Sequence, residues 1–133
     1  MSLPLVLIVD DEAILLLAAR KALSMALGAG FRCETALSAE SALTVIDEAG
    51  GTVAAVVSDW RMPGMRGDEF LRKVRALGSS TCLILLTGYA DQAAVSILEQ
   101  EIQLAAVYQK PCQMARVADT IKTCLGAAAP GSG

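Results

Sequence analysis

Three short, unbroken apolar runs constrain the fold of this chain more than any other feature. They lie at residues 5–9, 53–58 and 81–86. Each has the length of a β-strand, and a strand that helices cover on both sides reads as a continuous apolar run. The runs therefore predict strands of a parallel sheet with helices on both faces.

Helical patterns separate these strands along the chain. The expected helices are Glu12–Leu27, a segment capped by Ser38 that ends near Ala49, Asp68–Leu77, a segment capped by Asp91 that ends near Gln103, and Cys112–Leu125. Two further strands are expected at Phe31–Thr35 and Leu104–Gln109. Right-handed crossovers between parallel strands place the helices on both faces. The predicted fold class is α/β: a doubly wound, five-stranded parallel sheet of order 2-1-3-4-5, a flavodoxin-like (βα)5 sandwich.

The composition fits one folded domain. The chain has 133 residues, of which 54% are hydrophobic and 19% charged, so it can bury a sizeable core. We expect one domain over residues 1–125 and a flexible C-terminal tail of linker or added residues at 126–133. No uncharged run is long and apolar enough to span a bilayer, and no basic segment precedes the first apolar run. These features predict a cytoplasmic protein without a membrane span or signal peptide.

Charge and residue usage exclude several function classes. The net charge is −3 and no basic stripe exists, which argues against direct nucleic-acid binding. Histidine is absent, which removes Ser-His-Asp and Cys-His catalysis.

The cysteines show no CxxC spacing and are expected to be reduced thiols. In the predicted sheet Cys33 and Cys82 are separated by about 14 Å, which is three strand spacings. Cys112 and Cys124 are about 18 Å apart along one helix. Neither of these pairs can form a disulfide.

The polar residues that interrupt the apolar pattern follow the predicted strands. Asp10 and Asp11 end the first, Asp59 the third, Thr87 the fourth and Lys110 the fifth. In an open α/β sheet, ligands bind beyond the carboxyl ends of the strands, where the strand order reverses. We therefore expect these five side chains to meet at one edge of the sheet.

Their charges favour a metal ion. Three carboxylates and one lysine leave about two negative charges, and neighbouring carboxylates raise each other's pKa unless a cation intervenes. A hard divalent ion with oxygen ligands fits, and Mg²⁺ is usual where phosphate is handled. An aspartate can attack phosphorus directly to form an acyl phosphate. The expected chemistry is Mg²⁺-dependent transfer of a phosphoryl group to an aspartate.

These residues and spacings resemble the receiver domain of bacterial two-component response regulators. The matching segments are Val9–Glu12, Asp59–Gly67, Leu86–Ala90 and Tyr108–Pro111. The resemblance covers about residues 4–125. Paired aspartates alone are common, but four segments in order, each closing a strand, are specific.

The resemblance implies a role for each acidic position. Asp59 would be the phosphoacceptor. Asp10 and Asp11 would bind Mg²⁺ directly or through water, together with Asp59 and the backbone carbonyl of Arg61. The phosphodonor would be a phosphohistidine on a sensor histidine kinase or a phosphotransfer protein.

The resemblance also implies a switch. Thr87 would bond the phosphoryl group and move toward it, and Lys110 would pair with that group. The Lys110–Pro111 bond would be cis. Tyr108 would turn inward when Thr87 shifts. The helix 91–103, the strand 104–109 and the helix 112–125 would then signal to an output domain or partner, or form a homodimer.

Three residues depart from the usual family pattern. Arg66 is interpreted as an exposed loop residue with a modest effect. Arg61 and Tyr89 are bulky where the family lines the approach of water to the acyl phosphate. Our hypothesis is that both slow self-hydrolysis of the phosphorylated state, and the alternative is that they are ordinary rim side chains.

The first helix carries four consecutive large apolar residues, Ile14 to Leu17. Because successive helical residues point about 100° apart, some of them must leave the buried stripe. We expect an exposed apolar patch beside the acidic site, suited to the helical domain of a kinase, unless flanking side chains cover it.

The function expected from these features is a phosphorylation-controlled signalling module without a turnover substrate, and so not an enzyme in the usual sense. The main alternative is an aspartate-dependent Mg²⁺ phosphohydrolase of the haloacid dehalogenase type, which usually shows Asp-x-Asp after its first strand. A flavodoxin-like electron carrier would need a phosphate-binding loop after that strand. A degenerate receiver would lack some of the acidic, Thr or Lys positions.

Overall fold

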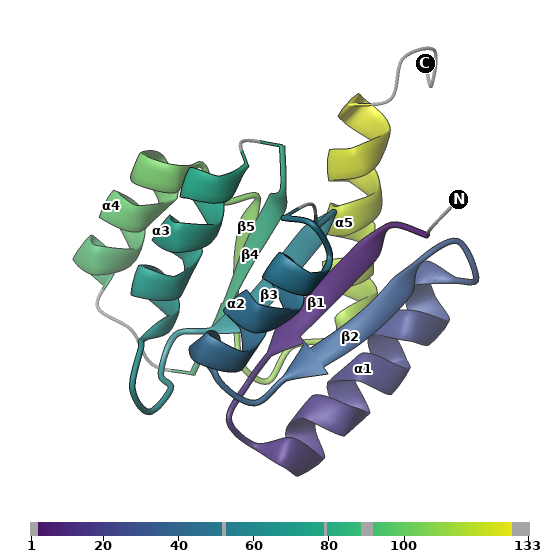
Figure 1. Cartoon of the computed structure of the whole chain (residues 1–133), viewed down its shortest axis with the longest axis horizontal. Coiled ribbons are helices and arrows are strands. Elements are labelled where there is room, and N and C mark those ends of the chain that lie inside the picture. Colours follow the sequence, from purple (N-terminus) through teal and green to yellow (C-terminus); the bar gives the residue numbers. More distant parts are fainter. Residues whose placement is uncertain (1–2, 52, 79, 89–91, 129–133) are drawn as a thin grey trace.

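A computed structural model describes residues 3–51, 53–78, 80–88 and 92–128. Its centre is a sheet of five parallel strands (Figure 1), namely β1 (Leu5–Val9), β2 (Arg32–Ala36), β3 (Ala55–Asp59), β4 (Cys82–Thr87) and β5 (Ala106–Gln109). The strand order is β2-β1-β3-β4-β5. This confirms the predicted fold class and places the reversal of strand order between β1 and β3.

Five helices cover the sheet in two layers. They are α1 (Ala13–Leu27), α2 (Ala39–Glu48), α3 (Gly67–Leu77), α4 (Gln92–Ile102) and α5 (Met114–Ala128). Helices α1 and α5 pack on one face, and α2, α3 and α4 lie on the other (Figure 1). The sheet is therefore doubly wound, as its sequence pattern predicts.

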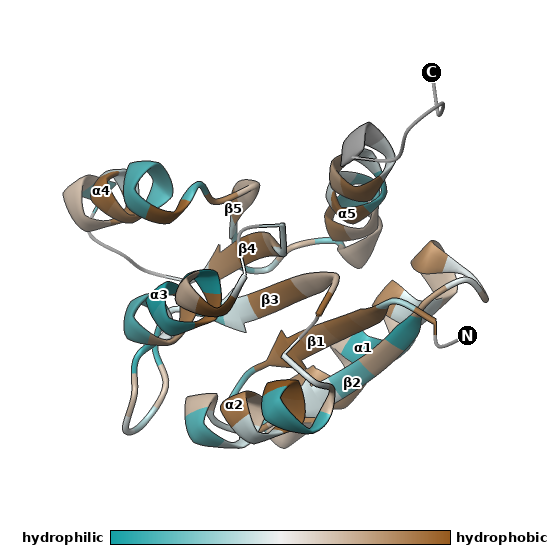
Figure 2. Cartoon of the chain, turned by 45° about the horizontal axis from the view of Figure 1, so that its top comes forward, coloured by the Kyte–Doolittle hydropathy of each residue, from teal (hydrophilic) through white to brown (hydrophobic). Residues whose placement is uncertain are grey.

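The apolar strands separate two hydrophobic clusters. Alternate residues of β1 point to opposite faces, so Leu7 joins the cluster under α2, α3 and α4, and Ile8 joins the cluster under α1 and α5. Strands β1, β3 and β4 are buried on both sides, and Figure 2 shows β1 and β3 as mostly hydrophobic ribbons between the helices. The edge strand β2 alternates instead, with Arg32 and Glu34 exposed. This rigid core fixes the positions of the residues at the carboxyl ends of the strands.

The element boundaries differ slightly from those expected. Ser38 caps α2 as predicted, since its hydroxyl accepts a hydrogen bond of 3.0 Å from the Ser41 backbone N–H. Strands β2, β3 and β4 each end one residue later than expected. Helix α5 begins at Met114, two residues late, and continues to Ala128, three residues beyond the expected end at Leu125. Helix α5 thus continues past Gly126 into the segment that the sequence analysis assigned to the tail, and residues 129–133 lie outside the described residues. Asp91, the expected cap of α4, lies outside the described residues.

All four cysteines are free, as expected. The two pairs considered from the sequence do not include the one that the fold brings together. Cys82 on β4 and Cys124 on α5 are neighbours. Burial and then the adjacent Cys124 thiol raise the pKa of Cys82 to about 12. The Cys82 thiol is therefore protonated at neutral pH.

No helix in the described part of the chain has the length and apolar character needed to cross a membrane.

Candidate functional site

Three carboxylates converge at the carboxyl edge of the sheet. Asp10 follows β1, Asp11 is its neighbour, and Asp59 is the last residue of β3. Each offers a carboxylate oxygen, and these oxygens all lie within 4.8 Å of one another. Because β1 and β3 are adjacent and parallel, their carboxyl ends bring the three residues together, as the sequence predicts.

Lys110, which follows the outer strand β5, bonds two of these carboxylates. Its Nζ donates to Asp10 Oδ2 at 3.0 Å and to Asp59 Oδ2 at 3.1 Å. The other oxygen of Asp59 accepts from the backbone N–H of Trp60 at 2.8 Å, and Asp10 Oδ1 accepts from that of Glu12 at 3.0 Å. Lys110 thus offsets the charge of Asp10 and Asp59, two of the three clustered carboxylates.

The burial of these groups shifts their pKa values. The pKa of Asp59 is raised, mainly because burial disfavours its charged form and also because Asp10 lies nearby, although Lys110 opposes the shift. Burial lowers the pKa of Lys110, but its hydrogen bonds to Asp10 and Asp59 outweigh that effect and raise it overall. Lys110 is therefore a fixed positive charge, and a further positive charge near Asp59 would favour its ionised form.

Thr87 adds an unsatisfied hydroxyl to the site. Its side chain is buried, and among the described residues its Oγ1 has no hydrogen-bond partner. Buried polar atoms are nearly always paired, so this hydroxyl is available to bond a water or a ligand. Thr87, Lys110 and the three aspartates line one cavity of about 1000 Å³. The cavity thus combines oxygen ligands for a cation with a lysine and a hydroxyl for an anion.

The loop between β3 and α3 depends on a residue whose role the sequence analysis did not identify. A Cβ on Gly67 would lie 2.0 Å from the backbone oxygen of Asp59, so only glycine fits there. The Gly67 N–H donates to the carbonyl of Trp60 at 2.9 Å, which closes the loop. The Ser58 hydroxyl donates to the same Asp59 oxygen at 2.9 Å. These contacts fix the backbone that presents the Asp59 carboxylate.

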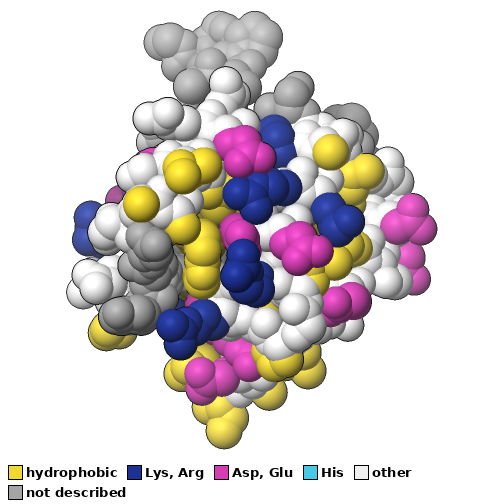
Figure 3. All heavy atoms as spheres, turned by 90° about the vertical axis from the view of Figure 1, so that its left-hand side faces the viewer, with side chains coloured by type: hydrophobic (Ala, Val, Ile, Leu, Met, Phe, Trp, Pro, Cys, Tyr) yellow, Lys and Arg dark blue, Asp and Glu magenta, His cyan; other side chains and the backbone are white. Residues whose placement is uncertain are grey.

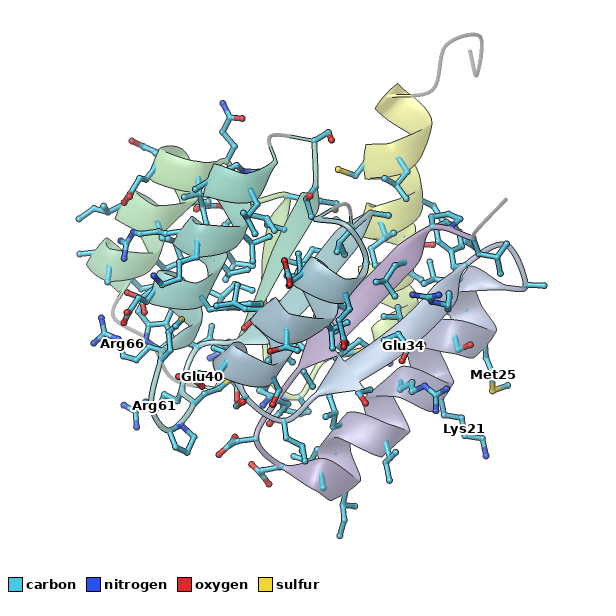
Figure 4. The ribbon with its side chains drawn as sticks, viewed as in Figure 1. Lys21, Met25, Glu34, Glu40, Arg61 and Arg66 are labelled. Atoms are coloured by element: carbon cyan, nitrogen blue, oxygen red, sulfur yellow. The ribbon has the colours of Figure 1, made fainter. Side chains whose placement is uncertain are left out.

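A second support of this loop comes from α2. Glu40 accepts a hydrogen bond of 3.3 Å from the Met65 backbone N–H and lies against Gly64, whose φ is +80°. Figure 4 shows Glu40 beside the loop, with Arg61 and Arg66 projecting outward from it. No local sequence pattern indicates the contact with Glu40, because it joins residues 25 positions apart.

Arg66 is exposed, as expected, but it also forms a double hydrogen bond with Asp68 at 3.0 and 3.1 Å. Arg72 joins Asp68 at 3.2 Å and Glu101 of α4 at 3.0 Å. Burial raises the pKa of Asp68, but Arg66 and then Arg72 outweigh this effect and lower it overall. Figure 3 shows the resulting surface, on which basic and acidic side chains alternate over α3 and α4. This network ties the loop that follows Asp59 to α4.

The remaining predicted residues fall into three cases. The Lys110–Pro111 bond is cis, as expected. Arg61 is exposed and lines the cavity, and Tyr89 lies outside the described residues. Tyr108 is half-buried on β5 next to Leu86 of β4, where its ring lies against α5.

The apolar patch expected on the first helix is present. Ile14 and Leu17 are 83% and 61% exposed, whereas Leu16 is buried. Figure 4 shows that Lys21 and Met25 also project outward from α1. Leu15 lines the cavity of the acidic site, so the patch adjoins that site.

Comparison with known proteins gives a consistent result. Residues 6–122 match the family model of the response regulator receiver domain. The chain is 32% identical over 120 residues to the sensor kinase CckA of Brucella abortus, covering 90% of this chain and 12% of that protein. It is 30% identical over 128 residues to the transcriptional regulatory protein FixJ of Bradyrhizobium diazoefficiens, covering 94% of this chain and 58% of that protein. The chain thus spans less than two thirds of the length of either relative.

Solved structures agree on the fold. A CheY-like response regulator receiver domain protein from Methanospirillum hungatei matches with a TM-score of 0.82 and 28% identity, covering 95% of this chain and 96% of that one. A receiver domain protein from Clostridium thermocellum matches with the same TM-score at 24% identity, covering 95% and 97% of the two chains.

Proposed function

The chain belongs to the response regulator receiver domain family, and from that premise we propose that Asp59 accepts a phosphoryl group in a Mg²⁺-dependent reaction. The observation that carries the proposal is the content of one cavity. It holds three carboxylates within 4.8 Å of one another, a lysine bonded to two of them, and the hydroxyl of Thr87, which has no partner in the part of the chain that the structure describes. Such a site can bind a cation and an anion side by side.

The donor set fits Mg²⁺. Asp10, Asp11 and Asp59 supply hard oxygen ligands, and we propose the backbone carbonyl of Arg61 as a further one. Bound there, the ion would neutralise the charge on the transferring oxygens. The raised pKa of Asp59 supports this assignment, because a cation would favour the ionised form that acts as nucleophile.

The chain's own residues then have defined tasks. A carboxylate oxygen of Asp59 attacks phosphorus and forms a P–O bond, while the P–N bond of the donor phosphohistidine breaks and its electron pair stays on the imidazole nitrogen. Lys110 pairs with a phosphoryl oxygen in place of its present hydrogen bond to Asp59. Thr87 donates its hydroxyl proton to another phosphoryl oxygen.

We propose that this step drives a switch. Thr87 moves toward the phosphoryl group, and Tyr108 turns inward from α5. The face formed by α4, β5 and α5 would pass the change to an output domain, a protein partner or a second copy of the chain.

The proposed donor is a sensor histidine kinase or a phosphotransfer protein. The exposed apolar residues of α1, including Ile14 and Leu17, adjoin the acidic cavity and would dock a helical domain. The cytoplasmic location expected from the sequence stays a prediction.

We further propose that Arg61 and Tyr89 slow hydrolysis of the acyl phosphate by restricting the approach of water. Arg61→Ala and Tyr89→Ala should then each shorten the lifetime of phosphorylated Asp59. Decay rates equal to wild type in both variants would leave them as ordinary rim side chains.

The labelling experiment that tests the main proposal uses the whole chain with acetyl phosphate and Mg²⁺, followed by intact mass. We expect one phosphoryl group per chain in wild type and in Asp47→Asn, an exposed control on α2, and none in Asp59→Asn or without Mg²⁺. An unlabelled wild type would contradict the proposal. Steady release of phosphate over many turnovers would instead favour the phosphohydrolase, which the family match does not favour.

A further inference from the structure

Tyr108 is held against α5 by two residues one helical turn apart. Its hydroxyl hydrogen-bonds with the Thr120 hydroxyl and also donates to the carbonyl of Arg116 at 3.3 Å. The guanidinium carbon of Arg116 lies 5.2 Å from the centre of the Tyr108 ring, which is within cation–π range. Thr120 and Arg116 thus contact both the polar tip and the face of the ring.

These polar contacts add to the packing of the ring against the hydrophobic cluster under α1 and α5. Tyr108 is only half-buried, and it borders a cavity of about 520 Å³ that Thr120, Arg116 and Thr123 also line. The cavity gives the ring space to turn on that side once its polar partners are lost. The orientation of Tyr108 therefore depends on side chains that a mutation can remove without disturbing the core.

We infer that Thr120 and Arg116 are positioning residues that hold Tyr108 in the resting conformation and so limit how often the switch visits its phosphorylation-competent state. The inference rests on the proposed function, in which Tyr108 leaves α5 on activation. Contacts made only in the resting state lower the population of the competent state. Because coupling between two sites is reciprocal, the same contacts slow the phosphorylation of Asp59.

The type of contact that is lost sets the expected change in the switch equilibrium and in the phosphorylation rate. Loss of one neutral hydrogen bond changes such an equilibrium about two- to tenfold. Loss of an exposed cation–π contact changes it about two- to fivefold. Thr120→Val should therefore raise the initial phosphorylation rate more than Arg116→Met does.

The first arm of the test observes Tyr108 without any phosphodonor. Wild type and variants carry ring-labelled tyrosine, and the Tyr108 signal is assigned in NMR spectra with Tyr108→Phe. We expect Thr120→Val to shift this signal and Thr120→Ser, which keeps the hydroxyl, to leave it at the wild-type position. Thr123→Val is the matched control, because it makes the same change on the same helix beside the same cavity.

The second arm measures the initial rate of labelling by acetyl phosphate with Mg²⁺. Thr120→Val should react about two- to tenfold faster than wild type. Arg116→Met should react about two- to fivefold faster, with Arg116→Lys closer to wild type because it keeps a cation. Rescue by Thr120→Ser and Arg116→Lys is the result that a merely structural role would not produce.

The outcomes separate this inference from the proposed function. Labelled wild type with equal rates in Thr120→Val and Thr123→Val would overturn the inference and leave the proposed function in place. An unshifted Tyr108 signal in Thr120→Val would overturn the inference alone. An unlabelled wild type would overturn the proposed function and, with it, the regulatory role of these contacts.

Discussion

The two ends of the sheet differ in how completely their polar groups are hydrogen-bonded. At the amino end, the Arg75 guanidinium donates to backbone carbonyls of Gly78, Thr81, Ile102 and Gln103 at 2.7 to 3.3 Å. At the carboxyl end, three carboxylates lie together, Lys110 bonds two of them, and the hydroxyl of Thr87 has no partner among the described residues. The first arrangement stabilises the fold, and the second leaves charge and hydrogen-bonding capacity for a ligand.

The largest change in stability is expected where the backbone that carries Asp59 is disturbed. It tests whether this backbone is rigid. Gly67→Ala would place a Cβ 2.0 Å from the Asp59 carbonyl oxygen, so the loop must shift. We expect a loss of about 3 kcal/mol in the free energy of unfolding, measured in urea.

The control for that change is Gly30→Ala, because an added Cβ there meets no atom within 4 Å. It should change the free energy of unfolding by less than about 0.5 kcal/mol. Equal stabilities of the two variants would show that the loop adapts freely and that Gly67 does not position Asp59.

The next effect concerns the amino end. Arg75→Met removes a charged donor from several carbonyls and should cost about 2 kcal/mol in the free energy of unfolding. Arg20→Met is the comparison, since its Nε contacts one carbonyl, that of Cys33, at 3.3 Å. An equal loss in both variants would mean that the multiple bonds of Arg75 add no stability.

At the carboxyl end, removing a charged side chain should raise the free energy of unfolding instead of lowering it. The pKa of Asp59 is higher in the fold than its ordinary 3.8, mainly because of burial. The stability that the protonated carboxyl contributes is therefore present below pH 3.8 and is lost as the pH rises through the raised pKa of the folded state. Without Mg²⁺, Asp59→Asn should therefore be more stable than wild type at neutral pH, by about 1 kcal/mol.

The difference in free energy of unfolding between Asp59→Asn and wild type should disappear well below pH 3.8, where Asp59 is protonated in the folded and the unfolded state. Urea unfolding across pH, with Asp47→Asn as the exposed control, measures it. A variant less stable than wild type at neutral pH would mean that the ionised carboxylate stabilises the fold.

The smallest effect lies on the surface between the two ends. The Arg72–Glu101 ion pair joins α3 to α4 at 3.0 Å with both side chains well exposed. Glu101→Gln should cost about 0.5 kcal/mol in low salt and less in high salt. Glu99→Gln on the same helix is the control. A cost that does not change with salt would contradict this interpretation.

The strand ends explain why the fold and most of the site are predictable from the sequence. Continuous apolar runs identify buried parallel strands, and such strands place Asp10, Asp59 and Thr87 at a common edge by topology alone. Features that depend on residues close together in the sequence, such as the Ser38 helix cap, were also predictable.

The parts that the sequence does not reveal depend on contacts between distant residues. Arg75 has no local motif, and its role emerges only when α3, β4 and α4 pack together. Cys82 and Cys124 become neighbours because α5 crosses β4, a pairing that spacing along the chain does not indicate. Gly67 was visible in its motif, but its close approach to Asp59 required the loop geometry.

The central proposal is that Asp10, Asp11 and Asp59 bind one divalent cation together, which would offset their mutual repulsion. Its most direct test is the free energy of unfolding with and without Mg²⁺. At about 100 times its dissociation constant, Mg²⁺ should stabilise wild type and Asp47→Asn by about 2.7 kcal/mol. It should stabilise Asp10→Asn and Asp11→Asn far less. Equal stabilisation of all four proteins, or none of wild type, would contradict the claim.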